Sequence, residues 1–566
     1  MKKFLWGLIT LSVSCALAAD SQPDQTAATV AKQSAEGRAA ATQQASELDK
    51  LRAQILEQQA QLERLQKAIA EENRLLQSLS SGQLPAATPD PSLRPNLGQI
   101  ASATPMVPPP LPPAPLPAPP PQAAEQPAAP TSPLQLHIGD ATITPVGFMD
   151  LTNTWRSTNS GASLATNFGN FPYNNAAAGR LTEDKFSAQN SRLGIRVDAK
   201  VHGANILGYY EGDFVGQVAV NNTQVTSNSM GYRIRLYWVD VRKGKFEMLA
   251  GQSWSLLTPN RNGLSALPGD LFYGQEFDVN YLNGLTWGRI PGIRFLYHPT
   301  KQVTAGISLE NADQYAGGSG GAGTITLPSA FAGNTFNNEI DANQTNDITI
   351  PNVHPDIIAK IAIEPVRSVH FEIAGLERTF KTFNPTTQQY FTVAGGGGSV
   401  NANVAVTKNL RLITNNFWSD GGGRYLFGQA PDLIIRANGS PSLVHSGSTV
   451  DGFEAQVGKF QFYTYYGGIL VGRNTALDAN GTSLIGWGYR GAANSQNRAI
   501  QEVTFGWIHT LWRDPRYGAL QYITQYAYFM RDPWYVAAGA PKNAHQNAIW
   551  FNLRYTLPGS APTIEY

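Results

Sequence analysis

The sequence predicts an all-β protein, an antiparallel transmembrane β-barrel of about sixteen strands behind a short coiled-coil helix and a proline-rich linker. Three observations predict it. Apolar and polar residues alternate from residue 134 onward, the connections between the alternating segments are short and long in turn, and only 15% of the 566 residues are charged. The formal net charge of +1 lacks the basic excess of a nucleic-acid-binding protein. The single cysteine excludes a disulfide framework.

The first 19 residues have the composition of a secretory signal peptide. A basic start is followed by an apolar stretch over residues 4–18 that ends in small residues. This stretch is too short to span a membrane. A lipoprotein signal at Cys15 is the alternative, but Ser12 stands where that motif needs leucine. In the simpler interpretation Cys15 is removed with the signal peptide, which leaves a mature chain without cysteine.

Residues 27–80 contain no proline and carry an apolar heptad repeat, which predicts a coiled coil and therefore self-association. The predicted seam consists of Leu48, Leu51, Ile55, Leu62, Leu65, Ile69, Leu76 and Leu79. Mixed leucine and isoleucine leave the number of helices open, with a trimer favoured, and a helix folded back on its own domain is the alternative. Residues 81–133 hold roughly half of the 37 prolines and predict an extended spacer.

Residues 134–566 are the predicted barrel domain. The clearest strand covers residues 192–201, where Leu193 and Ile195 point one way and Arg192 and Arg196 the other. Such a run has about ten residues, the length of a tilted strand that crosses a bilayer. The ascending strands are predicted at 142–156, 205–217, 245–252, 303–310, 368–380, 410–417, 460–471 and 519–530. The descending strands are predicted at 187–201, 230–242, 289–298, 354–364, 391–406, 448–457, 499–512 and 546–557.

The connections favour a membrane barrel over a soluble β-protein, which remains the alternative. One edge has short turns, whereas segments such as 311–352, 418–447 and 472–497 are long and rich in Gly, Asn, Ser and Thr. Sixteen strands predict a water-filled lumen rather than a packed core. Aromatic residues near the strand ends predict girdles at the membrane interfaces. They are Trp155, Trp238, Tyr297, Phe417, Trp418, Tyr463, Tyr465, Trp507, Trp512, Tyr522, Tyr526, Tyr528 and Trp534.

Four short motifs begin or cross the first strands: Pro-Val-Gly-Phe-Met-Asp at 145–150, Ser-Arg-Leu-Gly at 191–194, Arg-Ile-Arg-Leu-Tyr-Trp-Val-Asp at 233–240 and Leu-Ala-Gly-Gln-Ser-Trp at 249–254. With the signal peptide, coiled coil and linker, they make the chain resemble Gram-negative trimeric outer-membrane porins, most of all the DcaP-like branch. The resemblance implies a homotrimer in a bilayer with lipopolysaccharide. It also implies diffusion of small hydrophilic solutes, with small dicarboxylates favoured. One departure is that residues 558–566 follow the last predicted strand, on which many porins end.

The segment 253–288 stands at the place of the third outer loop, which folds into the lumen of trimeric porins. Acidic residues predicted in this loop or on the lumen wall are Asp270, Glu276, Asp278, Glu211, Asp213 and Glu372. Basic residues predicted on the wall are Arg192, Arg196, Lys200, Arg233, Arg235, Arg294 and Lys360, with Arg378, Arg411 and Arg554 as weaker candidates. A positive excess would concentrate anions, and guanidinium groups match carboxylates. The alternative is a lumen with charges of both signs and no selectivity.

Catalytic patterns are weak in this sequence. The eight histidines lack metal-binding spacing and are interpreted as interface or turn residues, and the Gly-rich motif at 318–323 precedes no helix pattern. We therefore predict no enzymatic activity, no cofactor and no metal. The predicted function is passive or weakly selective diffusion through the bacterial outer membrane, with the coiled coil in the periplasm. A structural tether between the outer membrane and the cell wall is the alternative, and an adhesin with external helices is disfavoured.

Overall fold

The computed structural model describes most of the predicted barrel domain, namely residues 134–160, 164–216, 231–264, 272–276, 281–318, 323–332, 353–384 and 386–558. The predicted signal peptide, coiled coil and linker lie outside the described residues, as do Asp270 and Asp278. The described helices are the short 3-10 turns η2 (Ala177–Arg180), η3 (Ser329–Phe331) and η4 (Gly423–Tyr425). Within these ranges no helix has the length and hydropathy of a membrane span.

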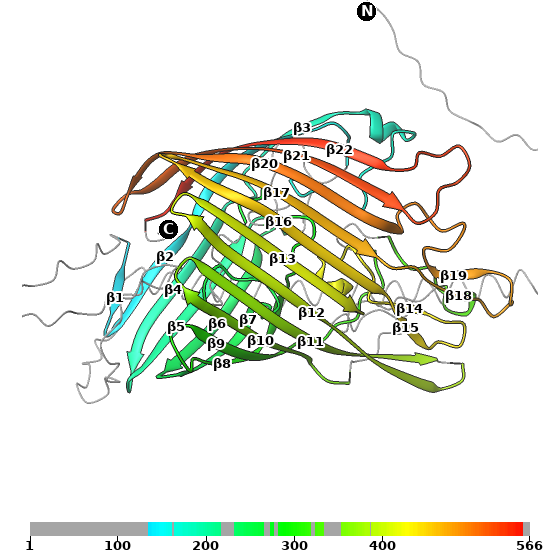
Figure 1. The fold of residues 1–566 in the computed structure, drawn as a ribbon, viewed down its shortest axis with the longest axis horizontal. Helices are drawn as coiled ribbons and strands as arrows, with labels where there is room; N and C mark the ends of the chain where they lie inside the picture. Colours follow the sequence, from blue (N-terminus) through cyan, green and yellow to red (C-terminus); the bar gives the residue numbers. More distant parts are fainter. Residues whose placement is uncertain are drawn as a thin grey trace, which may run out of the picture. The chain divides into compact units, whose positions relative to one another are not determined.

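Antiparallel strands form one sheet that closes on itself (Figure 1). The strands of the first half are β1 (Leu136–Ile138), β2 (Ala141–Arg156), β3 (Glu183–Ser187), β4 (Arg192–Val201), β5 (Ala204–Asp213), β6 (Arg233–Lys243), β7 (Phe246–Trp254), β8 (Arg289–Tyr297) and β9 (Val303–Glu310). Those of the second half are β10 (Asp356–Val366), β11 (Val369–Asn384), β12 (Gln389–Thr407), β13 (Leu410–Asp420), β16 (His445–Val457), β17 (Phe460–Val471), β20 (Asn497–Asp514), β21 (Gly518–Pro533) and β22 (Ala544–Thr556).

The barrel has sixteen strands, as predicted. It closes where β2 pairs with β22, from Phe148 opposite Thr556 to Arg156 opposite Ala548. Strands β3 and β4 count as one barrel strand because both pair with β2, one after the other, and β1 is a short addition to the start of β2. Two predicted strands, 303–310 and 460–471, coincide with β9 and β17.

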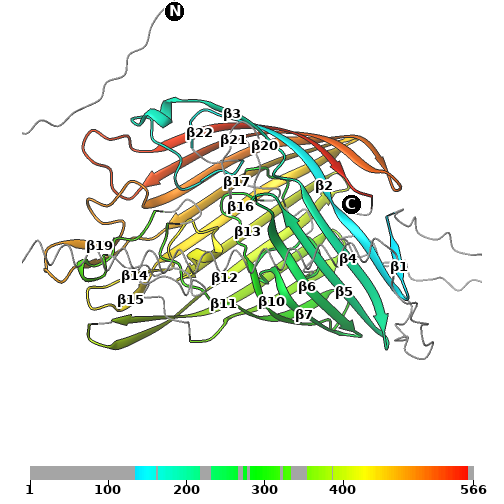
Figure 2. The ribbon, with the colours of Figure 1, turned by 180° about the vertical axis from the view of Figure 1, so that it is seen from behind.

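The two edges of the barrel differ as the sequence predicted. One edge has short turns, such as 202–203 between β4 and β5, and Gly458 with φ of +58° between β16 and β17. The other edge has the long loops, whose small hairpins β14 (Leu433–Ile435) with β15 (Pro441–Leu443) and β18 (Asn474–Leu477) with β19 (Leu484–Trp487) lie far from the short turns in Figures 1 and 2.

The outer face of the barrel is apolar because successive side chains alternate between the two faces. On β4, Leu193 and Ile195 are exposed whereas Arg192 and Arg196 are buried. The same pattern continues around the sheet, and exposed outward residues include Tyr237, Val239, Ile307, Leu309, Ile361, Ile373, Leu412, Phe453, Val503, Phe505 and Leu553. A continuous apolar belt of this kind is expected of a barrel in a bilayer.

One polar cluster interrupts the belt. Asp451 points outward from β16 and accepts hydrogen bonds of 2.5 Å from the hydroxyls of Thr414 and Thr449. Exposed Phe453 lies two residues further along β16, and exposed Leu470 lies on the neighbouring strand β17. The two threonine hydroxyls therefore replace water for a carboxylate that lies within the apolar belt.

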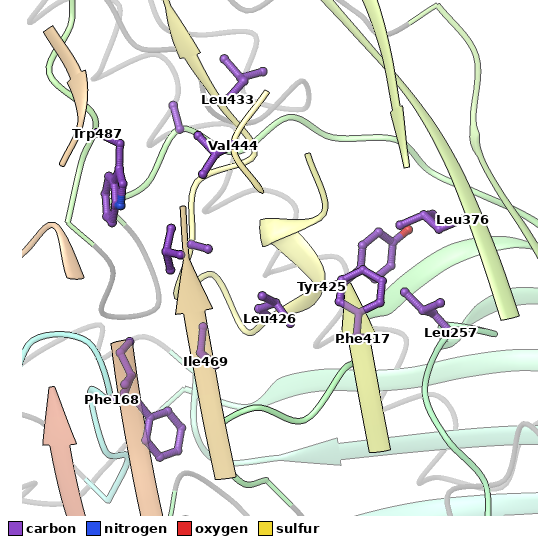
Figure 3. Close-up of a cluster of buried hydrophobic side chains, with 14 of the residues drawn as sticks. Phe168, Leu257, Leu376, Phe417, Tyr425, Leu426, Leu433, Val444, Ile469 and Trp487 are labelled. Carbon is purple, nitrogen blue, oxygen red and sulfur yellow. The ribbon is translucent and has the colours of Figure 1, made fainter. Parts of the chain in front are cut away.

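The interior differs from the predicted water-filled lumen. At the loop edge, the loops fold inward and pack a buried apolar cluster against the wall, with Phe168, Tyr425, Leu426 and Trp487 each at most 1% exposed (Figure 3). The described loop edge is therefore a packed core.

Four of the aromatic residues predicted for the girdles point inward instead. Trp238, Phe417, Tyr463 and Tyr465 are each at most 5% exposed. The reason lies in the infolded segments, which give these rings apolar partners: the ring of Phe272 lies 5.2 Å from that of Tyr465. Period-two alternation alone does not reveal such partners.

Replacing an outward residue with a charge tests the apolar belt. Ile373 is 52% exposed on β11, and we expect Ile373→Lys to lower the free energy of unfolding in lipid vesicles by about 2–4 kcal/mol, because the ammonium would enter hydrocarbon. Urea unfolding followed by Trp fluorescence measures this difference. Val353→Lys is the matched control, since Val353 is 53% exposed outside the strands. Equal stability of the two variants would contradict a lipid-facing belt.

Candidate channel constriction

The connection between β7 and β8, residues 255–288, is here called the inner loop. The structure describes its first arm, 255–264, and two parts of its second arm, 272–276 and 281–288. The loop is closed at its base by a hydrogen bond of 2.7 Å from Ser255 N to Gly288 O. Both arms contact inward side chains of the wall, so the inner loop lies inside the barrel.

Wall carboxylates hold the first arm by its backbone. The pairs are Leu256 N with Glu310 at 2.8 Å, Asn260 N with Glu372 at 3.1 Å, and Gly263 N with Glu364 at 3.0 Å. An N–H group buried inside the barrel needs an acceptor, and an ionised carboxylate is a strong one. The first arm is thereby fixed along β9, β10 and β11.

Two ion pairs add to this attachment. Arg261 of the first arm forms a bidentate pair with Glu454 on β16, with its two bonds at 2.5 and 2.8 Å. Lys360 on β10 donates to Thr258 O at 2.8 Å and lies 2.7 Å from Glu372. The first arm therefore contacts the wall on both sides.

The second arm crosses to the opposite part of the wall. Its backbone N–H groups donate to wall side chains, with Gln275 N bonded to Gln525 at 3.1 Å, Asn283 N to Glu502 at 2.8 Å and Thr286 N to Asn415 at 3.0 Å. Gly284, with φ of +89°, approaches the wall so closely that a Cβ would lie 2.4 Å from Thr449 O. Only glycine fits at this position, because a larger residue would collide with the wall.

Glu276 is the one predicted acidic loop residue that the structure describes. It is fully buried, its Oε1 accepts from the hydroxyl of Thr504 at 2.8 Å and from the amide of Gln525, and its carboxyl contacts that of Glu502. Burial, followed by the repulsion of Glu502, raises the pKa of Glu276 well above its ordinary value. The two carboxyl groups are therefore docked with a shared proton.

Apart from Lys200, the predicted basic wall residues lie inside the barrel, and most of them are paired. Arg192 lies 3.9 Å from Glu211, Arg196 2.9 Å from Asp198, Arg233 2.6 Å from Asp213, Lys360 2.7 Å from Glu372, and Arg235 2.7 Å from both Glu211 and Asp213. Arg294 donates to Trp254 O at 2.5 Å, whereas Lys200 is exposed near a short turn. Of the weaker candidates, Arg554 pairs with Asp150 at 2.7 Å and Arg411 donates to Asn403.

These ion pairs affect the predicted excess of positive charge on the lumen wall. Counted over the described residues, nine Arg and Lys side chains are buried, against thirteen Asp and Glu. Each buried guanidinium near a carboxylate contributes little net field at a distance, because the two charges cancel. The described interior is a set of ion pairs rather than an uncompensated row of arginines.

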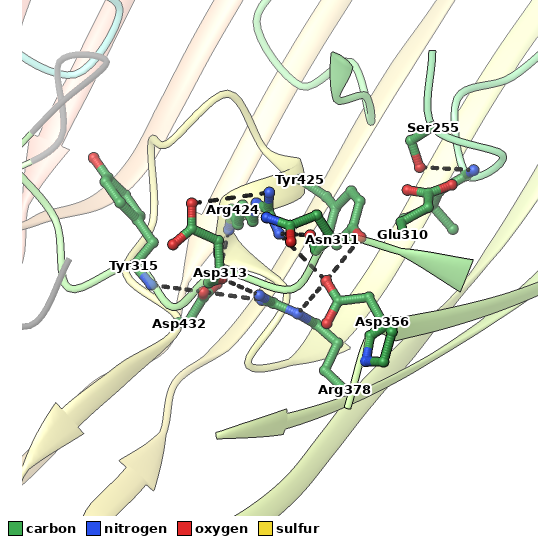
Figure 4. A network of polar contacts seen from close by, with 12 residues as sticks. Ser255, Glu310, Asn311, Asp313, Tyr315, Asp356, Arg378, Arg424, Tyr425 and Asp432 are labelled. Carbon is green, nitrogen blue, oxygen red and sulfur yellow. Dashed lines mark hydrogen bonds and ion pairs between the residues drawn. The ribbon is translucent and has the colours of Figure 1, made fainter. Parts of the chain in front are cut away.

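A second network fixes the long loops. Arg378 on β11 lies 3.0 Å from Asp356 on β10 and 2.9 Å from Asp432 in the loop before β14 (Figure 4). Its guanidinium also donates to Gly421 O and Asp313 O, and the hydroxyl of Tyr425 donates to Asp356 at 2.9 Å. Loops that follow β9 and β13 are thus attached to one buried arginine.

Sequence reasoning missed several of these groups. Glu310 and Glu502 have the inward parity of their strands, so the alternation that found Glu211 could have found them. Asp432 gives no such signal because it lies in a loop. His370, which the sequence predicts to be an interface or turn residue, lies beside the turn at 367–368, but its burial (3% exposed) between two carboxylates inside the barrel has no signal in the sequence.

The chain is similar in structure to the outer membrane channel DcaP of Acinetobacter baumannii, with a TM-score of 0.54 and 15% identity over 74% of this chain and 97% of that chain. It is also similar to an anion-selective porin from Comamonas acidovorans, with a TM-score of 0.41 and 12% identity over 74% of this chain and 99% of that one. No protein-family model and no curated protein matches the chain. The predicted resemblance to DcaP is confirmed for the barrel fold.

The docking of the second arm should weaken as pH rises. Glu276 is docked in its protonated form, so deprotonation above its raised pKa places two negative charges together and favours release. A cysteine introduced as Thr286→Cys reports on this arm. We expect its rate of thiol modification, divided by that of Ser440→Cys, a half-buried position in the turn between β14 and β15, to rise with pH in an otherwise unchanged protein and to stay level with Glu276→Gln. The same rise with Glu276→Gln would contradict this assignment.

Removing the guanidinium of Arg378 should release the loops at the loop edge. Arg378→Leu leaves the buried carboxylates of Asp356 and Asp432 without their cation, which destabilises the native state by about 3–5 kcal/mol. We expect larger single-channel conductance and a lower midpoint of urea unfolding. Arg436→Leu is the control, because Arg436 is exposed in the turn between β14 and β15. Unchanged conductance in Arg378→Leu would show that the attached loops do not limit the channel.

Proposed function

We propose that this protein is an outer-membrane porin through which small hydrophilic solutes diffuse. The observation that carries the proposal is the inner loop, whose backbone is hydrogen-bonded to wall side chains on both sides of a closed barrel with an apolar outer belt. We expect a loop fixed in this way to narrow the lumen of the barrel. Selectivity in such a channel arises from the size and charge of the constriction.

We propose that charge selectivity is weak, with a preference for small carboxylates. The ion pairs described above leave little net field, which favours weak selectivity. The base of the inner loop supports a preference for carboxylates. There the indole N–H groups of Trp254 and Trp287 are buried without an acceptor among the described residues. Their rings lie 5.6 Å apart, and Arg289 lies over the ring of Trp287. Donors gathered in this way suit a carboxylate.

We propose a homotrimer in the outer membrane, with the long loops toward lipopolysaccharide and the predicted coiled coil and linker in the periplasm, within reach of the cell wall. The start of β2 lies at the short-turn edge, because Thr142 pairs with Asp198 near the turn at 202–203. Short turns face the periplasm in outer-membrane barrels. The segment before β2 therefore leaves the barrel on the periplasmic side, which supports a periplasmic leader rather than an external adhesin.

Single-channel recording in planar lipid bilayers tests the proposal. Purified protein should produce stepwise conductance, a small reversal potential in a salt gradient, and partial block by added succinate. A deletion of residues 27–133 is the control, since the barrel lies outside it and conductance should persist. Absence of conductance from folded, inserted protein would contradict a porin, and a strong cation preference would contradict the carboxylate preference.

A further inference from the structure

His370 occupies a position that the diffusion function alone does not explain. It lies on β11 beside the short turn at 367–368, with its ring inside the barrel and 3% exposed. Its Nδ1 is 3.0 Å from Oε1 of Glu364, and its Nε2 is 3.0 Å from Oε1 of Glu372. The ring thus bridges two carboxylates that belong to different strands, β10 and β11.

The same two oxygen atoms hold the first arm of the inner loop. Oε1 of Glu364 accepts the hydrogen bond from Gly263 N, and Oε1 of Glu372 accepts the one from Asn260 N. His370 therefore fixes the spacing of two acceptors that bind two backbone N–H groups of the arm. A shift of either carboxylate would lengthen a bond to the loop.

The hydrogen-bonding pattern requires a charged ring. Ionised carboxylates only accept hydrogen bonds, so both ring nitrogens of His370 have to donate, and only imidazolium carries both protons. A neutral ring would turn one lone pair toward a carboxylate oxygen at 3.0 Å. Loss of the proton would therefore replace one hydrogen bond with a repulsive contact.

The charges around His370 balance only in this protonated state. Glu372 also lies 2.7 Å from Nζ of Lys360 and accepts from the amide of Asn401 at 2.9 Å. Beyond Lys360 lie Arg294 and Glu310, one positive and one negative. With imidazolium, the two carboxylates and two cations cancel, whereas a neutral ring leaves one uncompensated negative charge in a buried cluster.

We propose that His370 is a positioning residue of the channel: its imidazolium holds the first arm of the inner loop against the wall, and loss of its proton at alkaline pH releases the arm and raises conductance. The inference rests on the proposed porin function. It concerns the first arm only, so it is independent of the shared proton that docks Glu276 on the second arm.

Conductance measured from about pH 6 to about pH 10 tests the proposal, since this range begins near the ordinary histidine pKa of about 6.5. All variants carry Glu276→Gln, so that the second arm does not respond. In this background we expect conductance to rise with pH along a one-proton curve, in which the ratio of the two states changes about tenfold per pH unit. With added His370→Gln we expect high conductance at every pH.

The matched control is His298→Gln. His298 follows β8, and its Nε2 is 2.9 Å from Glu247 and its Nδ1 3.2 Å from Thr304, but among the described residues neither partner is hydrogen-bonded to the inner loop. This control should keep the pH-dependent rise. An independent readout is Thr258→Cys in the first arm, whose thiol modification relative to Ser440→Cys should increase over the same pH range.

Three outcomes would overturn the proposal. These are a flat conductance in the Glu276→Gln background, a rise that persists with His370→Gln, or a rise that disappears with His298→Gln alone. If the protein without substitutions forms no channels at any pH, the porin function itself fails. Channels that lack the His370 response contradict only the inference.

Discussion

The structure depends on one constraint: a long loop inside a barrel needs partners for its backbone N–H groups. An unsatisfied buried N–H costs about 1–3 kcal/mol, and the described parts of the loop form no regular ladder with the wall that would supply acceptors. Side chains of the wall supply them instead, with Glu310, Glu364 and Glu372 on one side and Glu502 and Asn415 on the other. Many inward side chains of the barrel therefore bind the loop rather than face the lumen.

This constraint also explains why the interior consists of ion pairs. Most carboxylates that accept from the loop are buried, with Glu364 half-buried, and a buried carboxylate needs a nearby cation or a proton. Lys360 forms an ion pair with Glu372, and Arg261 forms one with Glu454. Glu276 and Glu502 share a proton instead. Basic residues that the sequence suggests as an anion-attracting row, such as Lys360, therefore neutralise buried carboxylates instead. Selectivity has to come from groups outside these pairs.

The sequence predicted the strands well and the interior less well. A period of two fixed the faces of Leu193 and Arg192 because strand geometry alone determines them. The inward positions of Trp238 and Tyr465 depend on what the infolded segments bring against them, and the pairing of Arg378 with Asp432 joins a strand to a distant loop. Neither contact has a local signature. The inner loop was predicted from its length and its place between two strands, but the acceptors on the wall follow only from the register of many strands.

Two layers obstruct the barrel, and their chemistry differs. At the loop edge the obstruction is an apolar cluster around Tyr425 and Trp487, whose stability comes from burial and changes little with proton concentration. Deeper inside, the inner loop is held by charged and protonated groups, Glu276 on one arm and His370 on the other. In the proposed porin a solute would cross both layers in series, so the layer with the higher resistance would set the response of conductance to pH. Flow limited by the apolar layer would be insensitive to pH, whereas flow limited by the inner loop would follow the protons that dock it.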